Sequence, residues 1–264
     1  MTNQTKTAVI TGAGSGVGKA VAHIFLANGY NVVLSGRTES SLAAALEATS
    51  PTPDNGNGNG NGNDIGNGII VPTDVGVAKD VDRLFDITIE KFGRVDVLFN
   101  NAGIGSPPVD IDELTVEQWE RVMNTNIHGA FLCARRAFGE MKKQQPHGGR
   151  IINNGSISAH VPRPNSTPYT MSKHAMTGLT RCLALDGRPY DIACGQIDIG
   201  NAHTDMAEPL SVGARQPNGD VVGEPLMDVE HVATSVLHMA ELPLSANVLF
   251  MNVMATKMPF VGRG

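Results

Sequence analysis

Tyr169 and Lys173 are the residues of this chain whose types and spacing point most directly to chemistry. They lie four positions apart in a stretch with helical periodicity, so both side chains leave the same face of the helix and can approach each other. An ammonium group beside a phenol favours the phenolate and brings the phenol closer to proton exchange at neutral pH. The pair predicts a tyrosine that acts as general acid and base, although such pairs are also common as solvated surface contacts.

Ser156 is the third residue of this prediction. It lies thirteen positions before Tyr169 and directly after a predicted strand, where its hydroxyl can hold a substrate oxygen while the tyrosine moves the proton. Ser158 competes for the same role, and serines at such positions also serve as caps and turns. We interpret His160 and His174 as ordinary polar residues rather than as the base. The eight histidines show no metal-ligand spacing, so no metal site is predicted.

A glycine-rich segment near the N-terminus predicts a pyrophosphate site. It reads Thr11-Gly12-Ala13-Gly14-Ser15-Gly16-Val17-Gly18 and joins a predicted strand to a predicted helix. Unpaired N–H groups at a helix N-terminus favour an anion, and glycines let phosphate oxygens approach the backbone. The spacing departs from G-x-G-x-x-G, because Val17 stands where that motif needs its third glycine. A purely structural tight turn is the alternative.

The elements that must position these residues alternate between short apolar runs and longer stretches of helical periodicity. Strands are predicted at 7–10, 31–35, 68–72, 95–99, 150–154, 192–197 and 247–253. Helices are predicted at 17–27, 40–48, 81–92, 116–143, 167–186 and 229–241. This alternation favours an α/β fold with a single Rossmann-like, doubly wound domain over 1–264, in which about seven parallel strands are flanked by helices.

Two segments stand outside this alternation. An Asn/Gly tract at 51–68 has almost nothing to bury, so we expect a flexible surface insert there. The segment at about 201–225 is rich in Gly, Pro and small residues. We expect it to form a mobile lid over the substrate, although none of its residues identifies that substrate.

The motifs, taken in their order along the chain, resemble the short-chain dehydrogenase/reductase family. They are T-G-x-x-x-G-x-G from Thr11 to Gly18, Asp74-Val75, Asn100-Asn101-Ala102-Gly103, Asn126, Ser156 and Tyr169-x-x-x-Lys173. Each is weak by itself, but each follows a strand or lies in the expected helix. Because ligands bind beyond the carboxyl ends of parallel strands, we expect these residues to converge on one crevice.

The resemblance implies a hydride transfer between a nicotinamide dinucleotide and a ketone or secondary alcohol. Tyr169 would be the acid and base, Lys173 would also bond the nicotinamide ribose, Ser156 would polarise the substrate, and Asn126 would steady a water linked to Lys173. The implied cofactor-binding residues are Gly12, Ser15, Gly16, Val17, Gly18, Arg37, Asp74, Val75, Asn101, Ala102, Gly103, Tyr169, Lys173, Gly200 and Thr204. A homotetramer is implied as well.

The turn after the strand predicted at 31–35 helps to predict whether NAD(H) or NADP(H) is bound. Gly36 stands where the resemblance places the acid that selects NAD, and Arg37 beside it can pair with a 2′-phosphate. We therefore expect NADP(H) to be preferred, with NAD(H) possible if Arg37 is only a solvated surface charge. The chain departs from the family at Ile199-Gly200, where a Pro-Gly is usual, which leaves the loop past the nicotinamide less constrained.

Bulk composition excludes several other classes. A formal net charge of -6 gives no electrostatic reason to bind nucleic acid. No apolar run reaches the roughly 18 residues of a membrane span, and the polar N-terminus has no signal sequence, so a cytoplasmic protein is expected. Cys133, Cys182 and Cys194 are interpreted as buried, reduced thiols.

Two other functions stay open at this point. The first is a non-catalytic dinucleotide-binding redox sensor or scaffold, against which the joint presence of Ser156, Tyr169 and Lys173 argues. The second is epimerase or dehydratase chemistry on nucleotide sugars, whose enzymes usually carry an additional substrate domain.

Overall fold

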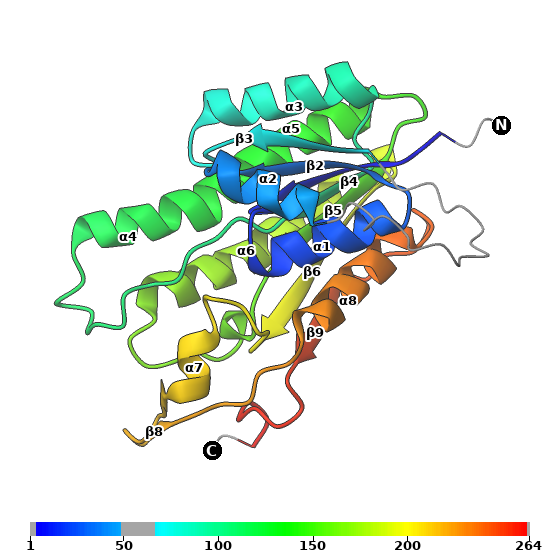
Figure 1. Cartoon of the computed structure of the whole chain (residues 1–264). Helices are drawn as coiled ribbons and strands as arrows, with labels where there is room; N and C mark the ends of the chain where they lie inside the picture. The colour runs from blue at the N-terminus through cyan, green and yellow to red at the C-terminus, as the bar shows by residue number, and fades with distance from the viewer. Residues whose placement is uncertain (1–3, 49–66, 263–264) are drawn as a thin grey trace.

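The computed structural model describes residues 4–48 and 67–262, which form a parallel sheet between two layers of helices (Figure 1). The sheet contains β1 (Thr7–Thr11), β2 (Asn31–Gly36), β3 (Gly68–Pro72), β4 (Val97–Asn100), β5 (Gly149–Asn154), β6 (Ile192–Gly200) and β9 (Phe250–Met254). Its seven strands lie in the order β3-β2-β1-β4-β5-β6-β9, and all pairs are parallel. The predicted doubly wound α/β fold with about seven parallel strands is confirmed.

The helices are distributed over both faces of the sheet. They are α1 (Gly16–Ala27), α2 (Glu39–Glu47), α3 (Ala78–Phe92), α4 (Val116–Met123), α5 (Ala130–Lys143), α6 (Thr167–Asp186), α7 (Glu208–Val212) and α8 (Val229–Glu241). Helices α1, α2 and α8 pack on one face, and α3 and α5 pack on the other. Because both faces are covered, the central strands are buried on both sides; all five residues of β1 are buried.

The register of the strands shows that each strand packs side chains against the helices on both faces of the sheet. In β1, Val9 pairs with Val33 of β2 and with Leu98 of β4, and all three belong to the core under α3 and α5. The preceding residue, Ala8, faces the core under α1 and α8. Successive side chains of a strand alternate between faces, so each strand contributes to both cores. The chain order reverses between β1 and β4, which is where an open parallel sheet binds its ligands.

The long helix predicted at 116–143 contains a π-helical turn. The structure divides it into α4, the π-helix η1 (Asn124–Gly129) and α5. Gly129 fits here because a Cβ would lie 2.6 Å from Cγ2 of Val75. A π-turn widens the helix by one residue and often occurs at functional sites. Hydrophobic periodicity did not reveal it.

The segment predicted to be a lid holds short regular elements. After β6 it contains α7 and a small antiparallel hairpin, β7 (Ala214–Arg215) with β8 (Val221–Val222). Both strands of the hairpin have only two residues, too few for a period-2 pattern to appear. Of the insert predicted at 51–68, residues 51–66 lie outside the described part, and Gly68 already belongs to β3.

Two further findings concern the exclusions made from composition. No helix within residues 4–48 and 67–262 has both the length and the apolarity that crossing a membrane requires. Cys133 and Cys194 are buried, as expected, but Cys182 is exposed, so the prediction of three buried thiols was wrong for this residue. Cys182 lies in α6 between the exposed Arg181 and the half-buried Leu183, on a face that the sheet does not cover.

Candidate functional site

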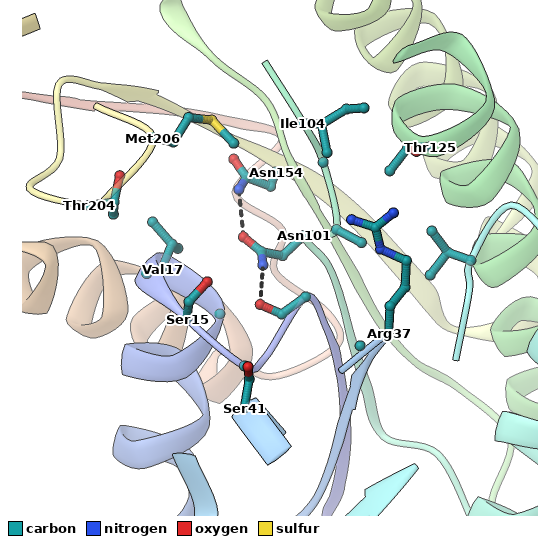
Figure 2. Close-up of a pocket in the computed structure, with 18 of the residues that line it drawn as sticks. Ser15, Val17, Arg37, Ser41, Asn101, Ile104, Thr125, Asn154, Thr204 and Met206 are labelled. Carbon is teal, nitrogen blue, oxygen red and sulfur yellow. Dashed lines mark hydrogen bonds between the residues drawn. The ribbon is translucent and has the colours of Figure 1, made fainter. Parts of the chain in front are cut away.

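A groove with a volume of about 330 Å³ opens at the carboxyl ends of β1 and β4 (Figure 2). We call it the main groove. It is lined by the predicted residues Gly12, Ser15, Gly16, Val17, Gly18, Arg37, Asp74, Val75, Asn101, Ala102, Gly103, Tyr169, Lys173 and Thr204. Gly200 is not among them, since a Cβ there would point at Met254 and Met258 of the C-terminal segment. Residues from distant parts of the chain are thus brought together as expected.

The glycine turn forms the floor of the main groove. Gly12 and Gly16 have φ angles of 67° and 50°, in the left-handed region that side chains rarely adopt. At Gly18 a Cβ would lie 2.2 Å from the carbonyl oxygen of Gly12, so only glycine permits this approach of α1 to the turn. The first turn of α1 therefore presents backbone N–H groups to the groove, an arrangement suited to a phosphate.

Amide side chains join three strand ends behind this turn. Asn101 donates through Nδ2 to the carbonyl oxygen of Thr11 at 2.8 Å, and its backbone N–H donates to Thr11 Oγ1 at 2.9 Å. Asn154 of β5 donates to Asn101 Oδ1 at 2.7 Å (Figure 2). The ends of β1, β4 and β5 are therefore fixed relative to one another. Asn154 was not singled out from the sequence, and the glycine motif that includes Thr11 did not reveal its bonds to Asn101, because these contacts depend on strand order.

Tyr169 and Lys173 lie together on α6, at the wall of the main groove. Lys173 is only 5% exposed, and its Nζ lies 5.4 Å from the centroid of the Tyr169 ring. Of its three N–H donors, one bonds the carbonyl oxygen of Asn154 at 2.8 Å. The predicted proximity of phenol and ammonium is present, and the ammonium is held by Asn154 at the end of β5, whose side chain also bonds Asn101.

A second cavity, of about 240 Å³, adjoins the main groove. We call it the side cavity. Val17, Asn154, Tyr169, Thr204 and Met206 line both spaces. The side cavity is also lined by Ser156 and Ser158, so both serine candidates face the same space. Ser156 Oγ accepts a hydrogen bond from the Ser158 backbone N–H at 3.1 Å, which leaves its hydroxyl proton free to be donated elsewhere.

Asn126 lies in the π-helical turn, buried and outside both cavities. Its Oδ1 accepts from the Ile104 N–H at 2.8 Å, and its Nδ2 donates to the Ile104 carbonyl at 3.0 Å and to Ser172 Oγ at 3.1 Å. Ser172 in turn donates to the carbonyl oxygen of Tyr169. The side chain of Asn126 therefore connects the loop after β4 to the turn of α6 that carries Tyr169.

Asp198 is a residue of the site that the sequence analysis missed. Its side chain is fully buried on β6, and Oδ1 accepts from the backbone N–H of Ser156 at 3.0 Å and from Gln196 Nε2 at 2.7 Å. Oδ2 lies 2.8 Å from His160 Nε2. Gly155 permits this contact, because a Cβ there would lie 1.9 Å from Asp198 Oδ1. An acidic residue directly after the strand predicted at 192–197 was the available signal, since a buried charge needs partners.

No group of three or more His, Cys, Asp or Glu side chains within the described ranges is arranged to hold a metal ion.

Comparison with known proteins agrees with this geometry. The model of the short chain dehydrogenase family matches residues 6–214. A 3beta-hydroxysteroid dehydrogenase of Mediterraneibacter gnavus is 32% identical over 232 residues, which cover 88% of this chain and 79% of the relative. A 3-oxoacyl-(acyl-carrier-protein) reductase of Synechocystis is 33% identical over 206 residues, which cover 78% of each protein.

A solved structure extends the similarity to three dimensions. The crystal structure of a 3-ketoacyl-(acyl-carrier-protein) reductase from Brucella melitensis, complexed with NADH, matches with a TM-score of 0.79 at 25% sequence identity. The match covers 95% of this chain and 97% of that chain. The similarity therefore includes the segment after residue 214, which the family model leaves out.

Proposed function

The chain belongs to the short chain dehydrogenase family, and from this membership we propose that it transfers a hydride between NADP(H) and a ketone or secondary alcohol. The observation that carries the proposal is the position of Tyr169. It stands where the main groove meets the side cavity, with the ammonium of Lys173 beside its ring. A proton donor at this junction can serve a substrate in the side cavity that faces a cofactor in the main groove.

The residues of the main groove fit a nicotinamide dinucleotide. The close approach of Gly18 to Gly12 and the free N–H groups of α1 would hold the pyrophosphate. Asp74 and Val75 would hold the adenine, and Lys173 would bond the nicotinamide ribose. When bound, the nicotinamide supplies or accepts a hydride at its ring. Thr204, which lines both spaces, is placed to bond the carboxamide, whereas we assign Gly200 only a packing role.

Side chains of the protein carry out the proton transfer that accompanies the hydride transfer. In the reducing direction Tyr169 donates its phenolic proton to the substrate oxygen, and Lys173 stabilises the phenolate that remains. The hydroxyl of Ser156 donates a hydrogen bond to the same oxygen as negative charge develops on it. Asn126 acts through α6 by holding the turn that carries Tyr169.

Turnover of simple substrates tests the proposal. A panel of ketones and secondary alcohols is assayed by nicotinamide absorbance with NADPH or NADH for reduction and with NADP⁺ or NAD⁺ for oxidation. We expect at least one ketone to be reduced with saturation kinetics. Tight dinucleotide binding without turnover across the panel would instead support a non-catalytic redox sensor or scaffold. The intact arrangement of Ser156, Tyr169 and Lys173 favours the enzyme.

The corner after β2 supports a preference for NADP(H). Arg37 is exposed, lines the main groove beside Thr38 and Ser41, and makes no hydrogen bond or ion pair within the described part of the chain. Gly36 before it offers no carboxylate to a ribose hydroxyl. A guanidinium with free donors suits the additional phosphate of NADP(H), which it can bind through two parallel hydrogen bonds.

NADPH is therefore expected to raise the melting temperature more than NADH at equal concentration, because a ligand that binds only the native state stabilises it by mass action. Arg37→Ala should weaken NADPH binding by about tenfold or more, as for a lost hydrogen bond to a charged group, and leave NADH binding nearly unchanged. Differential scanning fluorimetry and titration measure both effects. A larger shift with NADH in the wild-type protein would contradict the assignment of Arg37.

Asp198 is expected to be a positioning residue for Ser156. Asp198→Ala removes the acceptor of the Ser156 N–H, and a displaced hydroxyl should lower kcat by about ten- to a hundredfold with a smaller change in KM. Asp198→Asn keeps an oxygen acceptor and should restore most of kcat, which a general loss of stability would not explain. Wild-type kcat in a folded Asp198→Ala protein would refute this role.

The remaining proposals concern the lid, the assembly and the location. We propose that residues 201–225 close over the substrate, since Met206, Ala207 and Leu210 line the side cavity. We also propose a homotetramer, for which large apolar side chains exposed on α4, α5 and α6 offer contact surface: Val116, Phe131, Met171 and Leu185. Light scattering in solution tests it. The cytoplasmic location stays a prediction from the sequence.

A further inference from the structure

Arg163, which lines the side cavity, belongs to a buried ion pair. Arg163, in the loop before α6, donates from Nη1 to Glu224 Oε1 at 2.7 Å and from Nη2 to Oε2 at 2.6 Å. The Glu224 side chain is 1% exposed and that of Arg163 is 18% exposed. Two parallel hydrogen bonds between a guanidinium and a carboxylate are the strongest geometry such a pair can adopt.

Neutral amides also bond the carboxylate. Gln216 Nε2 donates to Glu224 Oε1 at 2.9 Å, and Asn201 Nδ2 donates to Oε2 at 2.8 Å. Asn201 Oδ1 also accepts from Arg163 Nη2 at 3.0 Å. Burial by itself would raise the pKa of Glu224, but the hydrogen bonds from Arg163, Gln216 and Asn201 lower it to about 2. Glu224 is therefore a carboxylate at neutral pH and balances the charge of Arg163.

The pairing of Arg163 with Glu224 determines the net charge that the wall of the side cavity presents to a ligand. Among its lining residues in the described part of the chain, Arg163 is the only one with a charged side chain. The rest of the wall consists of hydroxyl groups, amides and apolar side chains, with Ser106 and Ser166 on the polar side and Ile157 and Leu210 on the apolar side. An unpaired guanidinium here would attract a carboxylate or phosphate, whereas a guanidinium held by Glu224 has both of its terminal nitrogens engaged.

We propose that Glu224 masks the charge of Arg163 and thereby makes the side cavity selective for uncharged ketones and secondary alcohols. The inference rests on the proposed hydride transfer and adds the chemical class of its substrate. Glu224 and Arg163 are then specificity-determining residues that act through charge. A carboxylate-bearing ketone would have to displace Glu224 from Arg163, or be buried beside a neutral ion pair without a counter-ion, and both are unfavourable.

A double-mutant cycle on the charges of Arg163 and Glu224 tests this proposal with one pair of substrates. Ethyl levulinate and levulinate carry the same ketone and differ in that levulinate has a carboxylate. The selectivity ratio is kcat/KM for the ester divided by kcat/KM for the acid. It is measured for the wild-type protein, Glu224→Gln, Arg163→Gln and the double variant Arg163→Gln/Glu224→Gln, with melting temperatures recorded for each.

The wild-type protein is expected to prefer the ester. Glu224→Gln leaves an unbalanced guanidinium and should lower the selectivity ratio by about tenfold, the order expected for one unit charge near the ligand in a partly screened site. Arg163→Gln leaves an unbalanced carboxylate and should raise the ratio. The double variant is neutral again and should return close to the wild-type ratio. If the substitutions only loosened the segment 201–225, the selectivity ratio would change in the same direction in both single variants.

An unchanged ratio in Glu224→Gln, or a shift of the same sign in both single variants, overturns the inference. If one single variant does not fold, the other single variant and the double variant still decide it, because their expected ratios differ. Dissociation constants of both probes for the dinucleotide-loaded protein, from NMR titration, give the same comparison without turnover. Failure of the proposed reaction would abolish turnover of both probes, whereas failure of this inference would leave turnover without charge selectivity.

Discussion

Tyr169→Phe is expected to lower kcat by about a thousandfold while leaving dinucleotide binding nearly unchanged, because the substitution removes only the phenolic proton donor. The ring of Phe would keep the shape of the junction between the two cavities. Steady-state kinetics on a ketone that the wild-type protein reduces, and titration of NADPH by its fluorescence, measure the two quantities separately.

A second tyrosine provides the control for this substitution. Tyr190 packs edge-on against Phe138 with ring centroids 6.0 Å apart, and it lines neither cavity. Tyr190→Phe removes the same hydroxyl group elsewhere and should leave kcat unchanged. Turnover by Tyr169→Phe at the wild-type rate would remove Tyr169 from the mechanism and with it the proposed role of Lys173.

Gly18→Ala is expected to abolish measurable dinucleotide binding. A Cβ at this position would lie 2.2 Å from Gly12 O and 2.6 Å from Asn101 Nδ2, so either the turn or α1 must shift. Forcing a methyl group into a packed region destabilises a protein by about 1–3 kcal/mol. The larger effect falls on binding, because the shift moves the N–H groups that would hold the pyrophosphate. Titration with NADPH and thermal unfolding measure both.

Gly139→Ala is the matched control, since Gly139 also lies in a helix. A Cβ there would meet no heavy atom within 4 Å. This substitution should leave binding unchanged and stabilise the protein by about 0.5–1 kcal/mol, because alanine favours helices over glycine. Wild-type NADPH affinity in Gly18→Ala would show that the glycine turn is only a tight turn, the alternative that the sequence left open.

Much of the fold could be predicted because its signals are local. Helices α6 and α8 begin and end where hydrophobic periodicity and flanking residues place them, and the buried strands read as short apolar runs. The order of the motifs along the chain then identified the lining of the main groove. Gly200 was the exception, because its direction is set by the packing of β6 against the C-terminal segment.

The polar pairs that complete the site could not be predicted, because their partners are far apart in the sequence. Arg163 and Glu224 are 61 positions apart, and His160 and Asp198 are 38 apart. Each pairing depends on where β6 ends and how the following segment returns across the sheet. The π-helical turn was also missed, since its six residues contain one large apolar side chain, Ile127, which is too little for a period to be read.

A crystal structure of the protein with bound NADP⁺ tests the central claim most directly. The account predicts the pyrophosphate against the turn from Gly12 to Gly18, the 2′-phosphate beside Arg37, and the nicotinamide ring at the junction where Tyr169 and Ser156 face the side cavity. A dinucleotide bound elsewhere, or a nicotinamide ring out of reach of Tyr169, would contradict it.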